Sequence, residues 1–269
     1  MPPITDAILR RVSVRTFEDK PLSADDRAKL EAFLANVDTP FGAPVTFRLL
    51  DAAPHGLKSP VIVGAHSYVA AKVPRVPGAE LSCGYAFEKF CLYATQLGLG
   101  SVMLAASLSR KTFEQAMELA PNEVMPVASP VGYPAAKRSM RESMMRKAIK
   151  SDERLPWEKI FFAGSFGTPL APSSAGIFSQ PLEMLRLAPS ATNRQPWRVV
   201  VDGGAAHFFE ERTLKESALG DIQKVDMGIA LAHFDLVRQE AGINGEFVSR
   251  DPGLSVPANT LYITSFVTA

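Results

Sequence analysis

Cysteine and histidine are scarce in this sequence, and neither is spaced as a disulfide framework or a metal site requires. The 269 residues include two cysteines and four histidines, with no Cys-x-x-Cys pair and no ligand spacing among the histidines. Cys83 and Cys91 lie eight residues apart in one helical pattern, and a rise of about 12 Å is too long for a disulfide within a straight helix. We therefore expect no metal site and two reduced, apolar thiols, as in cytoplasmic proteins.

An excess of charge and long apolar runs are also missing. Lys and Arg number 29 against 28 Asp and Glu, which gives a formal net charge of +1. Such a balance creates no general attraction to nucleic acid or to an anionic membrane surface. No apolar run reaches the roughly 18 residues of a spanning helix, and residues 1–17 contain no apolar signal core. The composition predicts a cytoplasmic protein that binds neither nucleic acid nor membrane.

The sequence does contain an internal repeat in three blocks. Leu30-Glu31 before "APVTFRLLD" matches Leu182-Glu183 before "QPWRVVVD", 152 positions later. "GYAFEKFCLYATQLGLGSVM" (84–103) matches "GIALAHFDLVRQEAGINGEF" (228–247) at an offset of 144, and "MPVASPV" matches "LYITSFV" at 136. Three matches in one order, with an offset that shrinks by eight each time, indicate a duplicated unit, although hydrophobic periodicity alone can produce similar patterns.

Each copy is predicted to contain a helix, a strand, a long apolar helix and a further strand. The long helices are apolar on nearly all sides, which is typical of buried helices, and Gly98 and Gly242 are placed to end them. The predicted strands are 45–51, 60–66, 126–133, 197–203, 206–210 and 260–268.

A half that cannot cover its own long helix has to pack against a second copy. We therefore expect one α+β unit over residues 1–269, built from two intertwined pseudo-repeats that resemble a fused homodimer. The first pseudo-repeat is expected at about 1–165 and the second at about 166–269.

The N-terminal stretch "RRVSVRTF" alternates polar and apolar residues. In an extended segment, Arg11, Ser13 and Arg15 would lie on one side of the chain. Two guanidinium groups and a hydroxyl suit a phosphate monoester, because arginine binds oxyanions through two parallel hydrogen bonds. A sheet edge with salt bridges to Glu18 or Asp19 explains the pattern equally well.

A second polar stretch, "APSATNRQPW" (188–197), separates a helical pattern from a strand. It is either a simple turn or a loop laid against a polar, planar ligand whose buried groups need partners. Gln195 and Pro196 are expected to serve the loop itself, and Trp197 is expected in the core.

The segment 134–162, between the two copies, is the most basic part of the chain. Its predicted helix sets an apolar side against a basic side: Met140, Met144, Met145 and Ile149 against Arg141, Arg146, Lys147 and Lys150. We expect a surface helix with its basic side in solvent. The alternative is a basic lid over an anionic substrate.

These stretches, with "GLGSVMLAAS" and "PVASPVGYP", resemble the FMN-dependent nitroreductase family. That family begins with an Arg-x-Ser-x-Arg-x-Phe motif and has a Pro-Ser-Ser-x-Asn-x-Gln-Pro-Trp loop, normally close together in one copy. Here the first motif lies in the first copy and the second in the other copy. The arrangement is similar to a single-chain branch in which one polypeptide mimics the usual dimer.

The resemblance implies that FMN lies between the two copies. The first copy would hold the ribityl chain and phosphate through Arg11, Ser13, Arg15 and, in "RLPW", Arg154. The backbone turn Leu104-Ala105-Ala106 would run beside the flavin, with an amide N–H directed at N5. The second copy would supply Pro189, Ser190, Ala191, Asn193 and Asp226.

The resemblance also implies an oxidoreductase that moves hydride from NAD(P)H through flavin N5 to a nitroaromatic, quinone or similar small acceptor, in ping-pong order. It names no side-chain acid or base. Dehalogenation, dehydrogenation and a non-catalytic flavin-binding role are the alternatives. Because the usual dimer surface is internal, we expect a monomer.

The repeat predicts that the two clefts differ. At the offset of 152, Ser190 falls on Asp38 and Asn193 on Phe41, and the second copy has no Arg-x-Ser-x-Arg motif. One cleft has kept both walls and the other has lost both. We therefore expect one FMN per chain.

Overall fold

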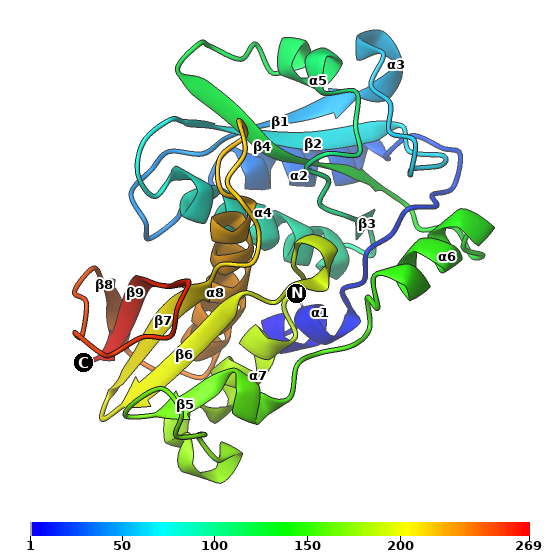
Figure 1. Cartoon of the computed structure of the whole chain (residues 1–269). Helices are drawn as coiled ribbons and strands as arrows, with labels where there is room; N and C mark the ends of the chain where they lie inside the picture. The colour runs from blue at the N-terminus through cyan, green and yellow to red at the C-terminus, as the bar shows by residue number, and fades with distance from the viewer. Residues whose placement is uncertain (1) are drawn as a thin grey trace.

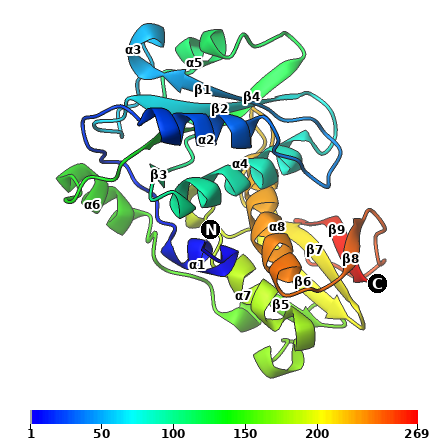
Figure 2. The same cartoon turned by 180° about the vertical axis from the view of Figure 1, so that it is seen from behind.

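Two β-sheets, joined by two long helices, make up the computed structural model, which describes residues 2–269 (Figures 1 and 2). The first sheet is antiparallel with the order β1-β2-β4-β3. Its strands are β1 (Thr46–Asp51), β2 (Ser67–Pro74), β3 (Gly100–Ser101) and β4 (Glu123–Gly132). The second sheet has the order β5-β6-β7-β9-β8. Its strands are β5 (Phe161–Ala163), β6 (Trp197–Asp202), β7 (Ala205–Glu211), β8 (Gly245–Val248) and β9 (Thr260–Thr268).

Without β5, the order of the second sheet repeats that of the first, strand for strand. The central antiparallel pairs also agree in detail, because Val131 of β4 lies opposite Ser67 and Val267 of β9 lies opposite Ala205. Both pairs contain a register shift in their interior. The predicted duplication of an α+β unit is confirmed.

The long helices α4 (Ala79–Gln96) and α8 (Ile222–Glu240) cross at a glycine of each. A Cβ atom on Gly84 would lie 1.9 Å from the carbonyl oxygen of Val225, and one on Gly228 would lie 2.1 Å from that of Leu81. Gly84 matches Gly228, and Leu81 matches Val225, at the offset of 144. Such reciprocal contacts are those of an approximate two-fold axis.

Strand β5 crosses from the first half to the second. It follows the first sheet in the chain, yet it pairs in parallel with β6 at the edge of the second sheet. This exchange and the crossed helices intertwine the two copies.

Six shorter α-helices of the described chain surround the sheets and the two long helices. They are α1 (Ile4–Arg10), α2 (Ala24–Leu34), α3 (Ala52–His55), α5 (Arg110–Ala116), α6 (Met140–Ala148) and α7 (Ser179–Arg186). Helices α3 and α5 lie on one face of the first sheet, and α2 and α4 on the other (Figure 1). The main core contains residues of both copies, including fully buried Phe90, Phe234 and Trp197, which confirms the core position predicted for Trp197.

The strand predicted at 60–66 is wrong. Residue 63 forms an isolated bridge to Thr16, and Gly64 has a φ of +78° beside the backbone of Phe17, so this apolar run is a loop. The true strand, β2, follows it and is buried on both faces between β1 and β4. Among residues 2–269, no helix has both the length and the apolar character that a bilayer crossing requires.

Candidate functional site

The N-terminal motif is an extended segment held by backbone hydrogen bonds on both sides. Val14 N–H donates to the carbonyl of Ser101 in β3 over 2.9 Å, and Val63 N–H donates to the carbonyl of Arg15 over 2.9 Å. The Val14 side chain packs so closely on Gly100 that a Cβ there would lie 2.8 Å from it. These contacts fix the backbone that carries Arg11, Ser13 and Arg15.

Arg15 is the least satisfied polar group of the motif. Its side chain is buried, and within residues 2–269 its Nε and one terminal nitrogen have no hydrogen-bond partner. Burial lowers the pKa of this guanidinium, the nearby Glu142 carboxylate raises it, and Arg146 lowers it. A buried cation with unpartnered N–H groups is costly, so an anion at this position would be stabilising.

Arg146 lies near Arg15 and also near Arg154, which in turn lies near Arg11. We call Arg11, Arg15, Arg146 and Arg154 the arginine cluster. Burial lowers the pKa of Arg154 first, and the charges of Arg11, Arg186 and Arg146 lower it further, against Asp152. Arg146 donates to the carbonyl of Ser13 over 3.4 Å and forms an ion pair with Asp152. Of the predicted residues, Arg11 and Arg154 thus lie close enough for their charges to interact, and Arg15 is connected to Arg154 only through Arg146, which lies near both.

Arg154 also has a structural role. Its guanidinium donates to the carbonyl of Leu187 over 3.0 and 3.2 Å and to those of Ser151 and Glu153, each over 2.9 Å. These bonds use four of its five N–H groups. Arg154 therefore ties the chain after α6 to the end of α7, with one N–H left for a ligand.

Helix α6 follows the predicted orientation of its two sides only in part. Met140 and Met144 are 81% and 67% exposed, whereas Glu142 and Arg146 are buried. The Glu142 carboxylate accepts from Thr16 Oγ1 over 2.8 Å and from Arg15 N–H over 3.3 Å. Hydrogen bonds to the polar groups of the N-terminal motif therefore stabilise this orientation of α6 more than burial of Met140 and Met144 would. Glu142 and Arg146 are therefore buried against the N-terminal motif, whereas Arg141, Lys147 and Lys150 remain exposed as predicted.

The polar loop of the second copy meets the chain that follows α6. The Asn193 amide donates to the carbonyls of Lys150 and Glu153 over 2.8 and 3.0 Å, which leaves its own oxygen as an acceptor. The Gln195 side chain donates to the Asn193 carbonyl over 3.3 Å, as its predicted service to the loop requires, and it also accepts from Leu155 N–H outside the loop over 2.8 Å. Between the loop and residues 148–155 lies a cavity of about 430 Å³.

Backbone strain marks the same loop. Thr192, Asn193 and Gln195 have φ values of 49°, 58° and 51°, a region that side chains other than glycine adopt at a cost. Ser190 Oγ accepts from the Gln195 N–H over 2.8 Å and helps to hold this conformation. The loop therefore has a defined conformation, in which Pro189 and Ser190 are half-buried.

Asp226 lies beneath the loop, near the start of α8. One carboxylate oxygen accepts from Ala191 N–H over 2.9 Å, and the other has no partner in the described chain. Burial raises the pKa of Asp226 well above its usual value; the Ala191 N–H opposes this, and Asp221 and Glu210 add to it. The neutral form of this carboxyl group is therefore favoured beside the predicted flavin loop.

The backbone turn at residues 104–106 corrects one expectation. Leu104 N–H donates to the carbonyl of Ala128 over 2.8 Å as part of a bridge to β4, so it has no N–H left for a flavin. Ala105 and Ala106 have N–H groups without a hydrogen bond to any of residues 2–269. These two remain as donors.

The second cleft is filled by aromatic side chains. Phe41, which corresponds to Asn193 in the repeat, lies with its ring centroid 5.6 Å from Tyr85 of α4 and 5.3 Å from Phe247 of β8. It therefore connects the two copies by apolar contact where Asn193 connects them by hydrogen bonds.

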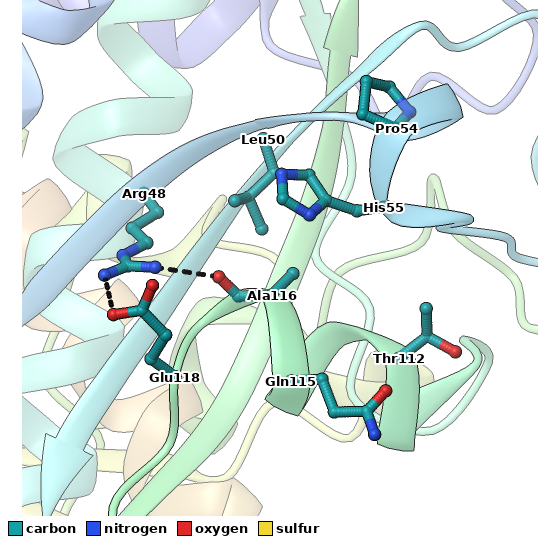
Figure 3. Close-up of a pocket in the computed structure, with 8 residues that line it drawn as sticks. All are labelled: Arg48, Leu50, Pro54, His55, Thr112, Gln115, Ala116 and Glu118. Carbon is teal, nitrogen blue, oxygen red and sulfur yellow. Dashed lines mark hydrogen bonds and ion pairs between the residues drawn. The ribbon is translucent and has the colours of Figure 1, made fainter.

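A further pocket of about 360 Å³ lies on the outer side of the first sheet, between β1, α3 and α5 (Figure 3). Arg48 faces it but is already bonded to the Glu118 carboxylate over 2.6 Å and the Ala116 carbonyl over 3.0 Å. No predicted site residue lines this pocket.

The sequence did not point to Glu142, nor to Glu88 of α4 and His233 of α8, both fully buried near Arg11. The available signal was a charged or polar residue within each long apolar helix. No group of three or more His, Cys, Asp or Glu in residues 2–269 is arranged to hold a metal ion.

Two sheets of one strand order, crossed helices and an exchanged strand define a nitroreductase-like fold in which a single chain takes the form of a dimer. The chain belongs to the nitroreductase family that is described as "Putative TM nitroreductase". The model of this family matches residues 3–238 of the chain.

One solved structure supports this fold over nearly the whole chain, and two others are similar over about half of it. A nitroreductase from Thermotoga maritima, described as putative, is 22% identical, with 98% of this chain and 93% of that chain covered and a TM-score of 0.64. An NADH dehydrogenase/NAD(P)H nitroreductase from Bacteroides thetaiotaomicron, also described as putative, is 22% identical over 51% of this chain and 89% of its own, with a TM-score of 0.42. A nitroreductase with bound FMN from Bacteroides fragilis is 17% identical over 52% and 92%, with a TM-score of 0.42. No curated protein matches significantly.

Proposed function

We propose that this protein is an FMN-dependent oxidoreductase that takes electrons from NAD(P)H and passes them to a nitroaromatic, quinone or similar small acceptor. The observation that carries the proposal is buried Arg15, with two nitrogens that no residue in 2–269 satisfies, within a cluster of four arginines. A phosphate monoester has the charge and the oxygens that such nitrogens lack.

The residues present fit FMN. Arg11, Ser13 and Arg15 would hold the phosphate and ribityl chain, with the last free N–H of Arg154. The Asn193 side-chain oxygen and the N–H groups of residues 105 and 106 would pair with the polar edge of the flavin ring, which loses water when it is buried. Bound FMN supplies hydride exchange at N5.

The chain's own contribution is to position the ring and exclude water. The neutral carboxyl group favoured at Asp226 adds no negative charge next to the loop, so it would not oppose a ligand that carries negative charge there. We further propose that the chain acts as a monomer with one FMN, because the crossed helices already bury the interface between its two copies.

An absorption spectrum of the purified protein, followed by titration of the apoprotein with FMN, tests the proposal. We expect flavin bands that NADH or NADPH bleaches without oxygen and that a nitroaromatic or quinone restores. A colourless protein that FMN does not stabilise against heat would refute it. Bound FMN that neither nicotinamide reduces would favour a non-catalytic role. Reduced flavin reoxidised only by halogenated substrates would favour dehalogenation.

A further inference from the structure

Three buried side chains connect the N-terminal motif to the crossing of the long helices. Glu88 of α4 and His233 of α8 are both 0% exposed, and the Arg11 side chain is 8% exposed. Oε1 of Glu88 lies 2.8 Å from Nε2 of His233 and 3.3 Å from Nε of Arg11. The three residues come from the N-terminal segment and from both copies of the repeat.

The hydrogen bonds determine how many protons Glu88 and His233 hold together. Nδ1 of His233 lies 2.8 Å from the carbonyl oxygen of Met184, which can only accept, so Nδ1 carries a hydrogen. The 2.8 Å contact between Nε2 and Glu88 then needs a second proton, on one atom or the other. In either form Glu88 and His233 together are neutral, and Arg11 gives the three residues one positive charge.

Packing does not explain such a network. Burying charged groups costs free energy even when they are paired, and Oε2 of Glu88 has no partner among residues 2–269. Nε of Arg11 forms an ion pair with Glu88 but no hydrogen bond, and the two terminal nitrogens of Arg11 make no hydrogen bond within the described chain. Glu88 therefore contacts the Nε side of the Arg11 guanidinium, and the two terminal nitrogens are left to bind a ligand.

We propose that Glu88 and His233 are positioning residues that hold the Arg11 guanidinium for the phosphate of FMN. This inference rests on the proposed function, because only there is Arg11 a phosphate ligand. The interface between the two copies thereby supports one wall of the cofactor site as well as the fold.

The molecule offers a matched control for this network. Tyr85 OH donates to the Asp235 carboxylate, so this contact also joins α4 to α8 and is also buried. It lies beside Phe41 in the filled cleft, and its arginine partner is Arg238, outside the arginine cluster. Asp235→Asn removes a buried carboxylate from the same helix pair without touching Arg11.

The test measures affinity for FMN and for riboflavin, which lacks the phosphate, on apoprotein of each variant. Glu88→Gln should weaken FMN binding by about 2- to 13-fold, the value of one polar contact of moderate strength, and leave riboflavin binding unchanged. His233→Asn should act in the same direction. In an Arg11→Ala background, Glu88→Gln should have no further effect on FMN affinity. Asp235→Asn should lower the melting temperature without changing the ratio of the two affinities.

Equal losses for FMN and riboflavin in Glu88→Gln, or additive losses with Arg11→Ala, would overturn the inference while the proposed function stands. Failure of the wild-type protein to bind either flavin would overturn both. If Glu88→Gln does not fold, Glu88→Asp keeps the charge but shortens its reach, and the same change in the FMN-to-riboflavin ratio is expected.

Discussion

Replacing Gly84 by alanine should force the two long helices apart at the point where they touch. The new methyl carbon would lie 1.9 Å from the carbonyl oxygen of Val225, whereas ordinary contacts begin at 3.4 Å. The obstacle is backbone, so no side-chain rotation relieves it. The helices have to separate by about 1.5 Å, and gaps of about 0.5–1 Å already forfeit a quarter to a half of the contact energy.

The expected loss of stability follows from two opposed effects. Overpacking a core costs about 3 kcal/mol at the upper end of the usual range, and this clash lies at or beyond that end. Alanine in place of glycine within a helix returns about 1 kcal/mol. We expect a net loss of at least about 2 kcal/mol, or a melting temperature lower by about 4–8 °C in a chain of this size.

Urea unfolding followed by circular dichroism measures this change. Gly228→Ala should cost a similar amount, and the double variant less than the sum, because helices that are already apart accommodate the second methyl group. Gly132→Ala is the control, since its Cβ would meet Phe17 at an ordinary 3.4 Å. A Gly84→Ala protein as stable as wild type, or more stable as helix propensity alone requires, would refute the reasoning.

Three further predictions concern the cofactor site and buried groups. Arg15→Ala should weaken FMN binding by about 10- to 150-fold, the value of a charge-assisted hydrogen bond; equal FMN affinity on titration would remove Arg15 from the site. Because the pKa of Asp226 is raised in the folded chain from 3.8, the folded state keeps a proton that the unfolded chain releases, and stability falls as pH rises above about 4. Asp226→Asn should therefore be more stable than wild type at about pH 7 and should show a smaller fall between about pH 4 and 7 in urea midpoints; an unchanged pH profile would contradict this. Burial raises the pKa of both Cys83 and Cys91, so a disulfide exchange reagent should label neither thiol in the native protein and both in denaturant; rapid native labelling would show that they are accessible.

Features that are repeated at the same position of both copies could be predicted from the sequence. Gly84 and Gly228 match because each copy needs close backbone approach at the same helix position. Gly98 and Gly242 match because both long helices end in the left-handed region, with φ of 77° and 70°. Such requirements exclude almost every other residue, so they remain visible in one sequence.

Features decided by distant partners could not be predicted. The apolar run at 60–66 has the composition of a strand, but its backbone pairs with the N-terminal motif. Strand β2 lies in the sheet instead, between β1 and β4. Helix α6 faces inward with Glu142 because Arg15 and Thr16 need partners there. The backbone hydrogen bond between Leu104 and Ala128 likewise depends on the folded sheet and leaves no signal in the sequence.

The candidate site lies between these extremes. The N-terminal arginines and the loop at Asn193 come from motifs separated by most of the chain, and the structure brings both to the segment that contains Arg154. The roles of Glu88 and His233 depend on the packing of α4 against α8, which no local pattern records.

Counting FMN bound to the apoprotein at saturation, by equilibrium dialysis against a known chain concentration, tests the central claim most directly. We expect one FMN per chain, because Arg154 of the arginine cluster and Asn193 line the same cavity, whereas Phe41 packs on Tyr85 and Phe247 at the corresponding position of the other copy. Two FMN per chain would show that both clefts are functional, and none would show that the unpartnered arginine serves another purpose.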